Sequence, residues 1–247
     1  MRRRDVLGAA LAIPAILRSG SALANEPVDV ELVLAVDVSR SVDPEEQELQ
    51  FSGYAAAFRD PRLIEGIMGG PVGAIACTLF TWSDFLTQIT VVPWTRLDSP
   101  ATAHRFAEAV AAASRRTGLY TSISGAMDHA ARQFGRGGFE GTRRVVDISG
   151  DGVNNSGRPV AEAREEALAQ GIVLNGLAVL DRSPQAATLN LGLPPLDTYY
   201  QTEVIGGPGS FLVVAEGFDA FEAAVRRKII REIAAAPPPG PLVERFA

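Results

Sequence analysis

The sequence predicts a doubly wound α/β fold: a Rossmann-like, mostly parallel six-stranded sheet with one antiparallel edge strand and helices on both faces. Short apolar runs, typical of strands buried on both faces, recur along the 247 residues. Segments of helical periodicity separate most of them, which is the pattern of a parallel sheet with crossover helices. The apolar runs cover residues 30–36, 72–80, 145–148, 172–180 and 211–214, and a more polar one covers 88–94.

The first helix follows the first apolar run and has a well-marked beginning. Asp43 can cap it, Pro44 suits its first position and Glu46 completes a capping box. Apolar side chains then recur with the spacing of one buried helical stripe: Phe51, Tyr54, Ala55 and Phe58.

The next element is a hairpin. The stretch FTWSDFLTQITVVPW (residues 80–94) predicts two strands joined by a turn near Ser83 and Asp84, so that one strand runs antiparallel. Pro93 cannot donate a backbone hydrogen bond and therefore suits an edge strand.

Four more helices are predicted. One opens at Ser99-Pro100, one spans residues 121–134, one ends at Gly171 and the last begins at Asp219 with Glu222 in its first turn. Their expected buried residues are Phe106, Ala109, Val110 and Ala113; Val160, Ala163, Ala167 and Leu168; and Phe221, Val225, Ile229 and Ile233.

The N-terminus predicts export. Residues 1–24 combine a basic start, a short apolar run and small residues at Ala22 and Ala24, as in a bacterial signal peptide. Arg3-Arg4 resembles a twin-arginine signal, and a Sec route stays open. We therefore expect a periplasmic or secreted protein, without stable membrane insertion after signal cleavage. Residues 25–234 would form one domain, and the Pro-rich residues 235–247 a flexible tail.

The amino-acid composition argues against several classes of function. The formal net charge of −6 becomes more negative when the basic leader is removed, so the chain should repel nucleic acid. A single cysteine, Cys77, cannot form an internal disulfide, and two histidines make a histidine-rich metal site or a catalytic triad improbable. We expect a monomer.

Three segments place oxygen-bearing side chains where the predicted sheet meets its helices. Asp37, Ser39 and Ser41 leave the first strand at alternate positions, so a curled turn can aim all three at one point. Asp151 follows the strand 145–148, and Thr121 starts a helix after a glycine turn. The carboxyl ends of parallel strands share one edge of the sheet, where open α/β sheets bind ligands.

This donor set predicts a hard divalent cation, Mg²⁺ before Mn²⁺ or Ca²⁺. Hydroxyl groups are neutral ligands. If Ser39, Ser41 and Thr121 bind directly while Asp37 and Asp151 act through water, the ion keeps positive charge and an open position. It could then bind the Asp or Glu side chain of a protein partner, whose identity the sequence does not give.

The motif D-x-S-x-S at Asp37–Ser41, the helix-opening Thr121 and the S-G-D-G turn containing Asp151 resemble a von Willebrand factor A (vWA) domain with a metal-ion-dependent adhesion site (MIDAS). The resemblance covers residues 28–233 and includes the order of strands and helices. It implies Mg²⁺ coordination by Ser39, Ser41 and Thr121, with Asp37 and Asp151 nearby. Bacterial secreted single-domain vWA-like proteins without assigned function are the most similar group.

Several other residues do not fit directly into the predicted fold and metal site. Asp147 interrupts a buried strand, and we favour a structural role over metal binding, with its charge neutralised by Arg143, Arg144 or an arginine elsewhere. Asn154 and Asn155 are interpreted mainly as turn residues, with contacts at the rim of the site as the alternative. A long loop at residues 181–200 either offers an apolar rim to a partner or packs locally; its apolar residues are Leu189, Leu191, Leu193, Leu196, Tyr199 and Tyr200.

Two alternatives to a binding module stay open. A metal-dependent phosphoester hydrolase could use the same acidic cluster, although the chain lacks a P-loop, a G-x-S-x-G elbow and a lysine near the motifs. Alternatively, the hydroxyl groups only cap helices and the acids only form turns. The expectation is a protein without enzymatic activity.

Overall fold

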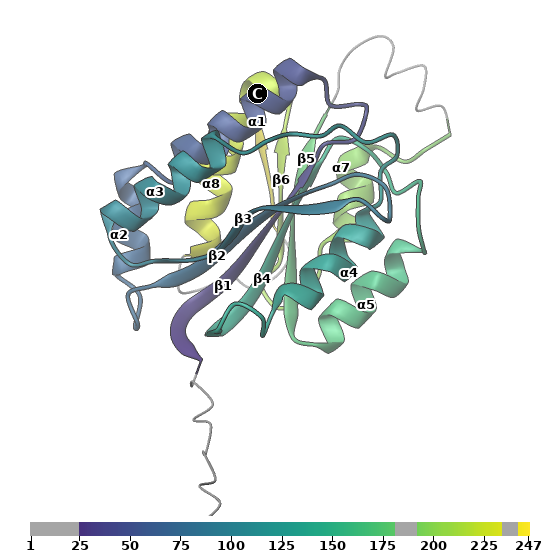
Figure 1. Ribbon diagram of the computed structural model, residues 1–247. Helices are drawn as coiled ribbons and strands as arrows, with labels where there is room; N and C mark the ends of the chain where they lie inside the picture. The colour runs from purple at the N-terminus through teal and green to yellow at the C-terminus, as the bar shows by residue number, and fades with distance from the viewer. Residues whose placement is uncertain (1–24, 181–191, 234–241) are drawn as a thin grey trace, which may run out of the picture.

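The computed structural model describes residues 25–180, 192–233 and 242–247. Within them, seven strands form one sheet in the order β3-β2-β1-β4-β5-β6-β7 (Figure 1). β3 is antiparallel to β2, and every other neighbouring pair is parallel. The strands are β1 (Glu26–Asp37), β2 (Ile75–Trp82), β3 (Gln88–Leu97), β4 (Phe139–Gly150), β5 (Ile172–Val179), β6 (Phe211–Ala215) and β7 (Leu242–Phe246).

The predicted α/β fold with its antiparallel edge strand is confirmed, but the predicted number of six strands is wrong. Residues 242–246, assigned to the flexible tail, form β7 and pair with β6. The Pro-rich stretch before them suggests coil, whereas the free edge of β6 offers these residues backbone partners that local sequence does not reveal.

Helices lie on both faces of the sheet (Figure 1). On one face lie α1 (Pro44–Ala57), α2 (Pro61–Met68), α3 (Pro100–Ala111) and α8 (Phe221–Ile233); on the other lie α4 (Ile123–Gln133), α5 (Val160–Ala169), α7 (Leu196–Tyr199) and the π-helical turn η1 (Tyr200–Val204). A short 3₁₀ turn η2 (Phe218–Ala220) precedes α8. No helix in these described ranges is both long and apolar enough to cross a membrane.

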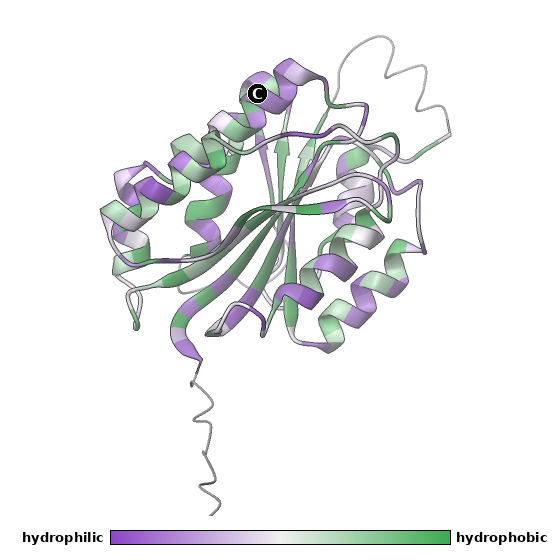
Figure 2. Cartoon of the chain, viewed as in Figure 1, coloured by the Kyte–Doolittle hydropathy of each residue, from purple (hydrophilic) through white to green (hydrophobic). Residues whose placement is uncertain are grey.

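Each face has its own hydrophobic core. Figure 2 shows hydrophobic residues along much of the central strands, while the helices carry both kinds of residue. The buried stripe of α1 is as predicted, and the capping box of Asp43 and Glu46 is present. In α3 the buried residues include Ala103 and Ala107, whereas the predicted Ala109 is exposed. The eight-residue helix α2 was not predicted.

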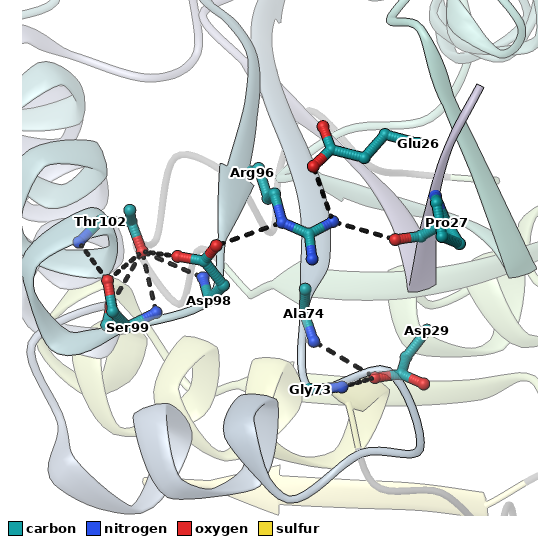
Figure 3. Close-up of polar contacts among 9 residues, drawn as sticks. All are labelled: Glu26, Pro27, Asp29, Gly73, Ala74, Arg96, Asp98, Ser99 and Thr102. Carbon is teal, nitrogen blue, oxygen red and sulfur yellow. Dashed lines mark hydrogen bonds and ion pairs between the residues drawn. The ribbon is translucent and has the colours of Figure 1, made fainter. Parts of the chain in front are cut away.

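Hydrogen bonds connect the beginning of β1 to the segment before β2 and to the end of β3, at the end of the sheet away from the candidate site (Figure 3). The Asp29 carboxylate accepts from the backbone N–H groups of Gly73 at 2.9 Å and Ala74 at 3.4 Å. Arg96 on β3 donates to the Pro27 carbonyl at 2.9 Å and pairs with Asp98. These contacts tie the beginning of β1 to β2 and β3.

Asp147 lies on β4 and is fully buried, as expected for a structural residue. The cation beside it is Lys228 of α8, whose Nζ is 2.5 Å from Asp147 Oδ1. This corrects the expectation of an arginine. Arg143 instead donates to the Glu232 carbonyl and Arg144 pairs with Glu31. The helix that supplies Lys228 is far from β4 in sequence, so no local pattern could reveal the pair.

Candidate metal centre

Three loops meet where β1 and β4 end. The two strands pair in parallel with Val36 opposite Ser149, so Asp37 at the end of β1 lies beside Gly150 at the end of β4. The start of α4 approaches the same edge, because Gly118 donates its N–H to the Val38 carbonyl at 3.0 Å. The sequence prediction that these segments converge is therefore correct in geometry.

The first loop curls back on itself after β1. Asp37 Oδ1 accepts the backbone N–H of Ser39 at 2.7 Å, and Val42 donates its N–H to the Ser39 carbonyl at 3.0 Å. The following helix begins at once, because Pro44 occupies its first turn and Asp43 caps it. Both serines of the motif consequently face the end of β4.

All five predicted site residues come together, and the side-chain oxygens of four of them form one chain. Thr121 Oγ1 is 3.2 Å from Ser39 Oγ, and Ser39 Oγ is 3.2 Å from Ser41 Oγ. Ser41 in turn donates to Asp151 Oδ1 at 2.7 Å. Asp37 joins the chain through the backbone of Ser39. Ser39, Thr121 and Asp37 are buried, while Ser41 is exposed and Asp151 is half-buried.

Asp37 is the most enclosed member of this site. Its Oδ2 is buried and has no hydrogen-bond partner among the described residues. A Cβ atom on Gly150 would lie 2.9 Å from this oxygen and 2.7 Å from the hydroxyl of Tyr200, so glycine is needed for the close approach. Burial, and then the charge of Asp151, raise the pKa of Asp37 well above its ordinary value. A bound cation would relieve both causes.

The residues fit a hard divalent cation. Oxygen is the only donor element in the site, and hydroxyls outnumber carboxylates. Neighbouring ligands in a magnesium octahedron, each about 2.1 Å from the ion, are about 3 Å apart. The hydroxyl oxygen of Ser39 lies 3.2 Å from those of Ser41 and Thr121, which agrees with that spacing. The described residues contain no cluster of three or more His, Cys, Asp or Glu with metal-binding geometry, so hydroxyl ligands are essential to this interpretation.

Asn154 and Asn155 hold the loops in place, a role that the interpretation as turn residues missed. Asn155 Oδ1 accepts the N–H of Thr121 at 2.8 Å, and the N–H of Asn155 donates to the Thr121 carbonyl at 2.8 Å. Asn154 Oδ1 accepts the N–H of Ser124 at 3.1 Å. In the sequence, this role is indicated by the position of the asparagines, one residue after the S-G-D-G turn.

The proposed apolar rim at residues 181–200 is present only in part. Leu189 and Leu191 lie outside the described residues. Leu193 is exposed, Leu196 and Tyr199 are half-buried, and Tyr200 is fully buried next to the site. The Tyr199 hydroxyl accepts the N–H of Asn154 at 3.3 Å. Residues 196–200, expected in a loop, form α7 and the first residue of η1, and they pack behind the site.

The fold is that of a von Willebrand factor A domain. Proximal thread matrix protein 1 from the mussel byssus is similar at a TM-score of 0.62 and 14% identity, over 84% of this chain and 48% of that one. Another structure of that protein is described with a zinc-occupied MIDAS motif, at a TM-score of 0.59 and 14% identity over the same shares. The von Willebrand factor type A protein from Catenulispora acidiphila has a TM-score of 0.55 and 14% identity over 84% and 43%. The present chain thus spans about half the length of these structures.

BatB from Bacteroides thetaiotaomicron, described as a conserved hypothetical protein, is similar over its whole length. Its TM-score is 0.52, with 19% identity over 84% of this chain and 100% of that one. The chain belongs to the family described as protein of unknown function (DUF1194), whose model matches residues 27–237. No curated protein matches the sequence significantly.

Proposed function

We propose that this protein is a metal-dependent protein-binding module that uses Mg²⁺ to capture an acidic side chain of a partner. The observation that carries the proposal is the convergence of five residues: the side-chain oxygens of Ser39, Ser41, Thr121 and Asp151 are linked at 2.7–3.2 Å, and Asp37 accepts the backbone N–H of Ser39. The zinc-occupied MIDAS motif described for the mussel byssus protein supports a divalent ion at this place in the fold. Mn²⁺ and Ca²⁺ are the other candidates.

The five site residues would have different roles in binding the ion. Ser39, Ser41 and Thr121 offer neutral oxygen ligands, while Asp37 orients Ser39 through its backbone N–H. Asp151 orients Ser41 through its hydroxyl. With the charged groups in this supporting role, the ion when bound supplies uncompensated positive charge and an open position for an outside carboxylate.

The surroundings of the site suit a protein surface as the partner. Arg40, between the two serines, is exposed and has no ion pair with another described residue, although the chain as a whole is acidic. Phe85 and Leu86 in the hairpin turn, and Leu119 and Tyr120 before Thr121, are all at least half exposed. Ser83 joins the two segments because its carbonyl accepts the N–H of Ser122 at 2.7 Å. An acidic side chain flanked by apolar residues would complement this surface.

Residues 1–24 support export, so we place the module in the periplasm or outside the cell. We propose that it acts as a monomer and without catalysis. A hydrolase is less well supported, because Lys228, the only lysine of the sequence, is buried with Asp147 and Glu232 and cannot bind a phosphate at the site.

Calorimetric titration of Mg²⁺ into metal-free protein tests the site. We expect the wild type to bind, and Asp37→Ala and Ser39→Ala to lose binding by at least a factor of about ten, because each change removes a ligand or its support. Ser52→Ala is the matched control, since its exposed hydroxyl donates only to the Leu49 carbonyl on α1. Undiminished binding by both site variants, with folding verified by circular dichroism, would reject the assignment.

Affinity capture from periplasmic extract tests the second half of the proposal. The wild type should retain partner proteins with Mg²⁺ and release them with chelator, and Ser39→Ala should retain none of them. Retention of the same proteins under all three conditions would instead indicate a surface that works without metal.

A further inference from the structure

The interior between β4 and α8 contains three ionisable side chains in mutual contact. Lys228 Nζ lies 2.5 Å from Asp147 Oδ1 and 2.5 Å from Glu232 Oε1. All three side chains have 0% exposure. Asn175 on β5 donates to Glu232 Oε1 at 3.2 Å, and the ring of Phe211 lies 5.6 Å from Nζ. The candidate metal centre uses none of these groups.

The charges of this triad do not balance if every group is ionised. One ammonium group faces two carboxylates, which leaves one negative charge in a site without solvent, an arrangement of high free energy. Burial raises the pKa of Asp147, and burial raises the pKa of Glu232 to about 7. The triad therefore favours the uptake of one proton, which makes one of the two carboxyl groups a neutral acid.

The contact between Lys228 and Asp147 is close without being a well-directed hydrogen bond. Neither carboxylate oxygen of Asp147 has a hydrogen-bond partner of acceptable geometry among the described residues. Because a carboxyl C–O bond is about 1.2 Å long, the carbon of Asp147 lies within about 3.7 Å of Nζ. Reacting atoms in near-attack geometry are about 3–3.5 Å apart.

We propose that Lys228 and Asp147 condense into an intramolecular amide bond that links α8 to β4. Glu232 takes a proton from the Lys228 ammonium group, and the neutral amine attacks the carboxyl carbon of protonated Asp147. The C–N bond forms, and Glu232 returns its proton to the departing hydroxyl group as the C–OH bond breaks. Glu232 then takes the second proton from the attacking nitrogen and ends as the neutral acid. One amide and one water replace one acid and one amine, without oxidation or reduction.

Such a bond would hold the last helix on the central strand. The chain has only one cysteine, so an internal disulfide is not available for this purpose. Burial favours the neutral acid form of Asp147, and it also excludes the water that would reverse the reaction.

Mass spectrometry of the full chain tests the bond. The denatured wild type should be about 18 Da lighter than its sequence requires, the mass of one water. Complete tryptic digestion should yield a branched peptide that joins residues 145–164 to residues 228–231, because trypsin cannot cleave after an acylated Lys228. Lys228→Arg should have the full sequence mass, since a guanidinium group is not a nucleophile under these conditions.

The Glu232→Gln variant tests the proton transfer while it preserves the packing of the side chain. The amide keeps the shape of the side chain but cannot carry the proton, so this variant should have its full mass with Lys228 and Asp147 unreacted. A wild type of full mass, whose digest contains the separate peptides 145–164 and 229–231, would overturn the proposal. The triad would then be an ion cluster held only by non-covalent contacts.

Discussion

Single residues hold the loops of the candidate metal centre in place, in addition to the residues proposed as ligands. Asn155 is a good example, because its side chain and its backbone both bond to Thr121 at 2.8 Å. These two bonds hold the loop after β4 against the start of α4. Groups that orient ligands are commonly worth a factor of 10 to 100 in metal affinity.

We therefore predict that Asn155→Ala lowers Mg²⁺ affinity about tenfold, although it removes no ligand. Calorimetry measures the affinity, and Ser156→Ala in the same loop is the control, because its hydroxyl accepts only a long bond of 3.4 Å from the N–H of Phe85. Equal affinities for the two variants would show that the loop is held by other contacts.

We predict that His129 makes the free energy of unfolding depend on pH. The imidazole lies on α4 beside Phe80, with ring centroids 4.6 Å apart, and bonds Gln133. Burial, helped by Arg132 and Arg136, lowers the pKa of His129 to about 4 from 6.5. The unfolded chain thus binds the proton more tightly. The contribution of neutral His129 to the free energy of unfolding is therefore complete above pH 6.5, and it is lost as the pH falls toward 4.

Because the ring is only half-buried, we expect the loss to be about 1–2 kcal/mol, less than the full shift would give. Urea unfolding at pH 7 and at pH 4.5 measures it. His129→Gln should be less sensitive to this change of pH than the wild type, whereas His104→Gln, at an exposed position on α3, should behave like the wild type. Identical pH profiles for all three proteins would contradict the assignment.

The last strand, β7, closes the edge of β6. Its residues pair in parallel with β6 from Phe211 to Ala215. Glu244 forms ion pairs with Arg227 at 3.1 Å and Arg231 at 2.7 Å, both on α8. Val243 and Phe246 pack against opposite hydrophobic cores. The strand therefore connects the last helix to both layers.

Removal of residues 242–247 should cost about 2–3 kcal/mol, mainly through the loss of the apolar contacts of two side chains. The exposed edge of β6 should also promote self-association, because free strand edges pair with other chains. Thermal unfolding and light scattering measure the two effects. A shortened chain that stays monomeric with unchanged unfolding temperature would show that β7 contributes nothing to the fold.

The elements that the sequence predicted have strong local signals. The runs that became β1, β4 and β5 are buried on both faces, so they are mostly apolar, with Glu31, Asp147 and Asn175 as buried polar exceptions. The helix α2 has only eight residues, too few for a clear periodicity. β7 follows a Pro-rich stretch and depends on a partner strand that is distant in sequence. Elements defined mainly by tertiary contacts were therefore missed.

In the candidate site, too, the residues with local sequence signals were predicted and those placed by tertiary contacts were not. Asp37, Ser39 and Ser41 form a local motif, and Thr121 and Asp151 follow recognisable turns, so the five could be predicted together. Tyr200 lies behind the site because η1 packs there, and Lys228 reaches Asp147 from α8. Such contacts connect segments without a shared local pattern, and only the folded chain brings them together.

The candidate cation site lies at one end of a sheet whose two faces have separate hydrophobic cores. Because three loops from both layers meet there, a bound ion would link β1, the start of α4 and the end of β4. An ion that binds the folded chain and not the unfolded one stabilises the fold by mass action. Metal binding should therefore be visible in global unfolding.

At a Mg²⁺ concentration one hundred times the dissociation constant, the expected gain is about 2.7 kcal/mol. For a domain of this size, 1 kcal/mol shifts the midpoint of thermal unfolding by about 2–4 °C, so the total shift should be about 5–10 °C. Chelator should abolish the shift, and Ser39→Ala should show none, while Ser52→Ala should keep it. An unchanged unfolding temperature for the wild type in saturating Mg²⁺ would mean that the oxygens near Asp37 satisfy one another and hold no ion.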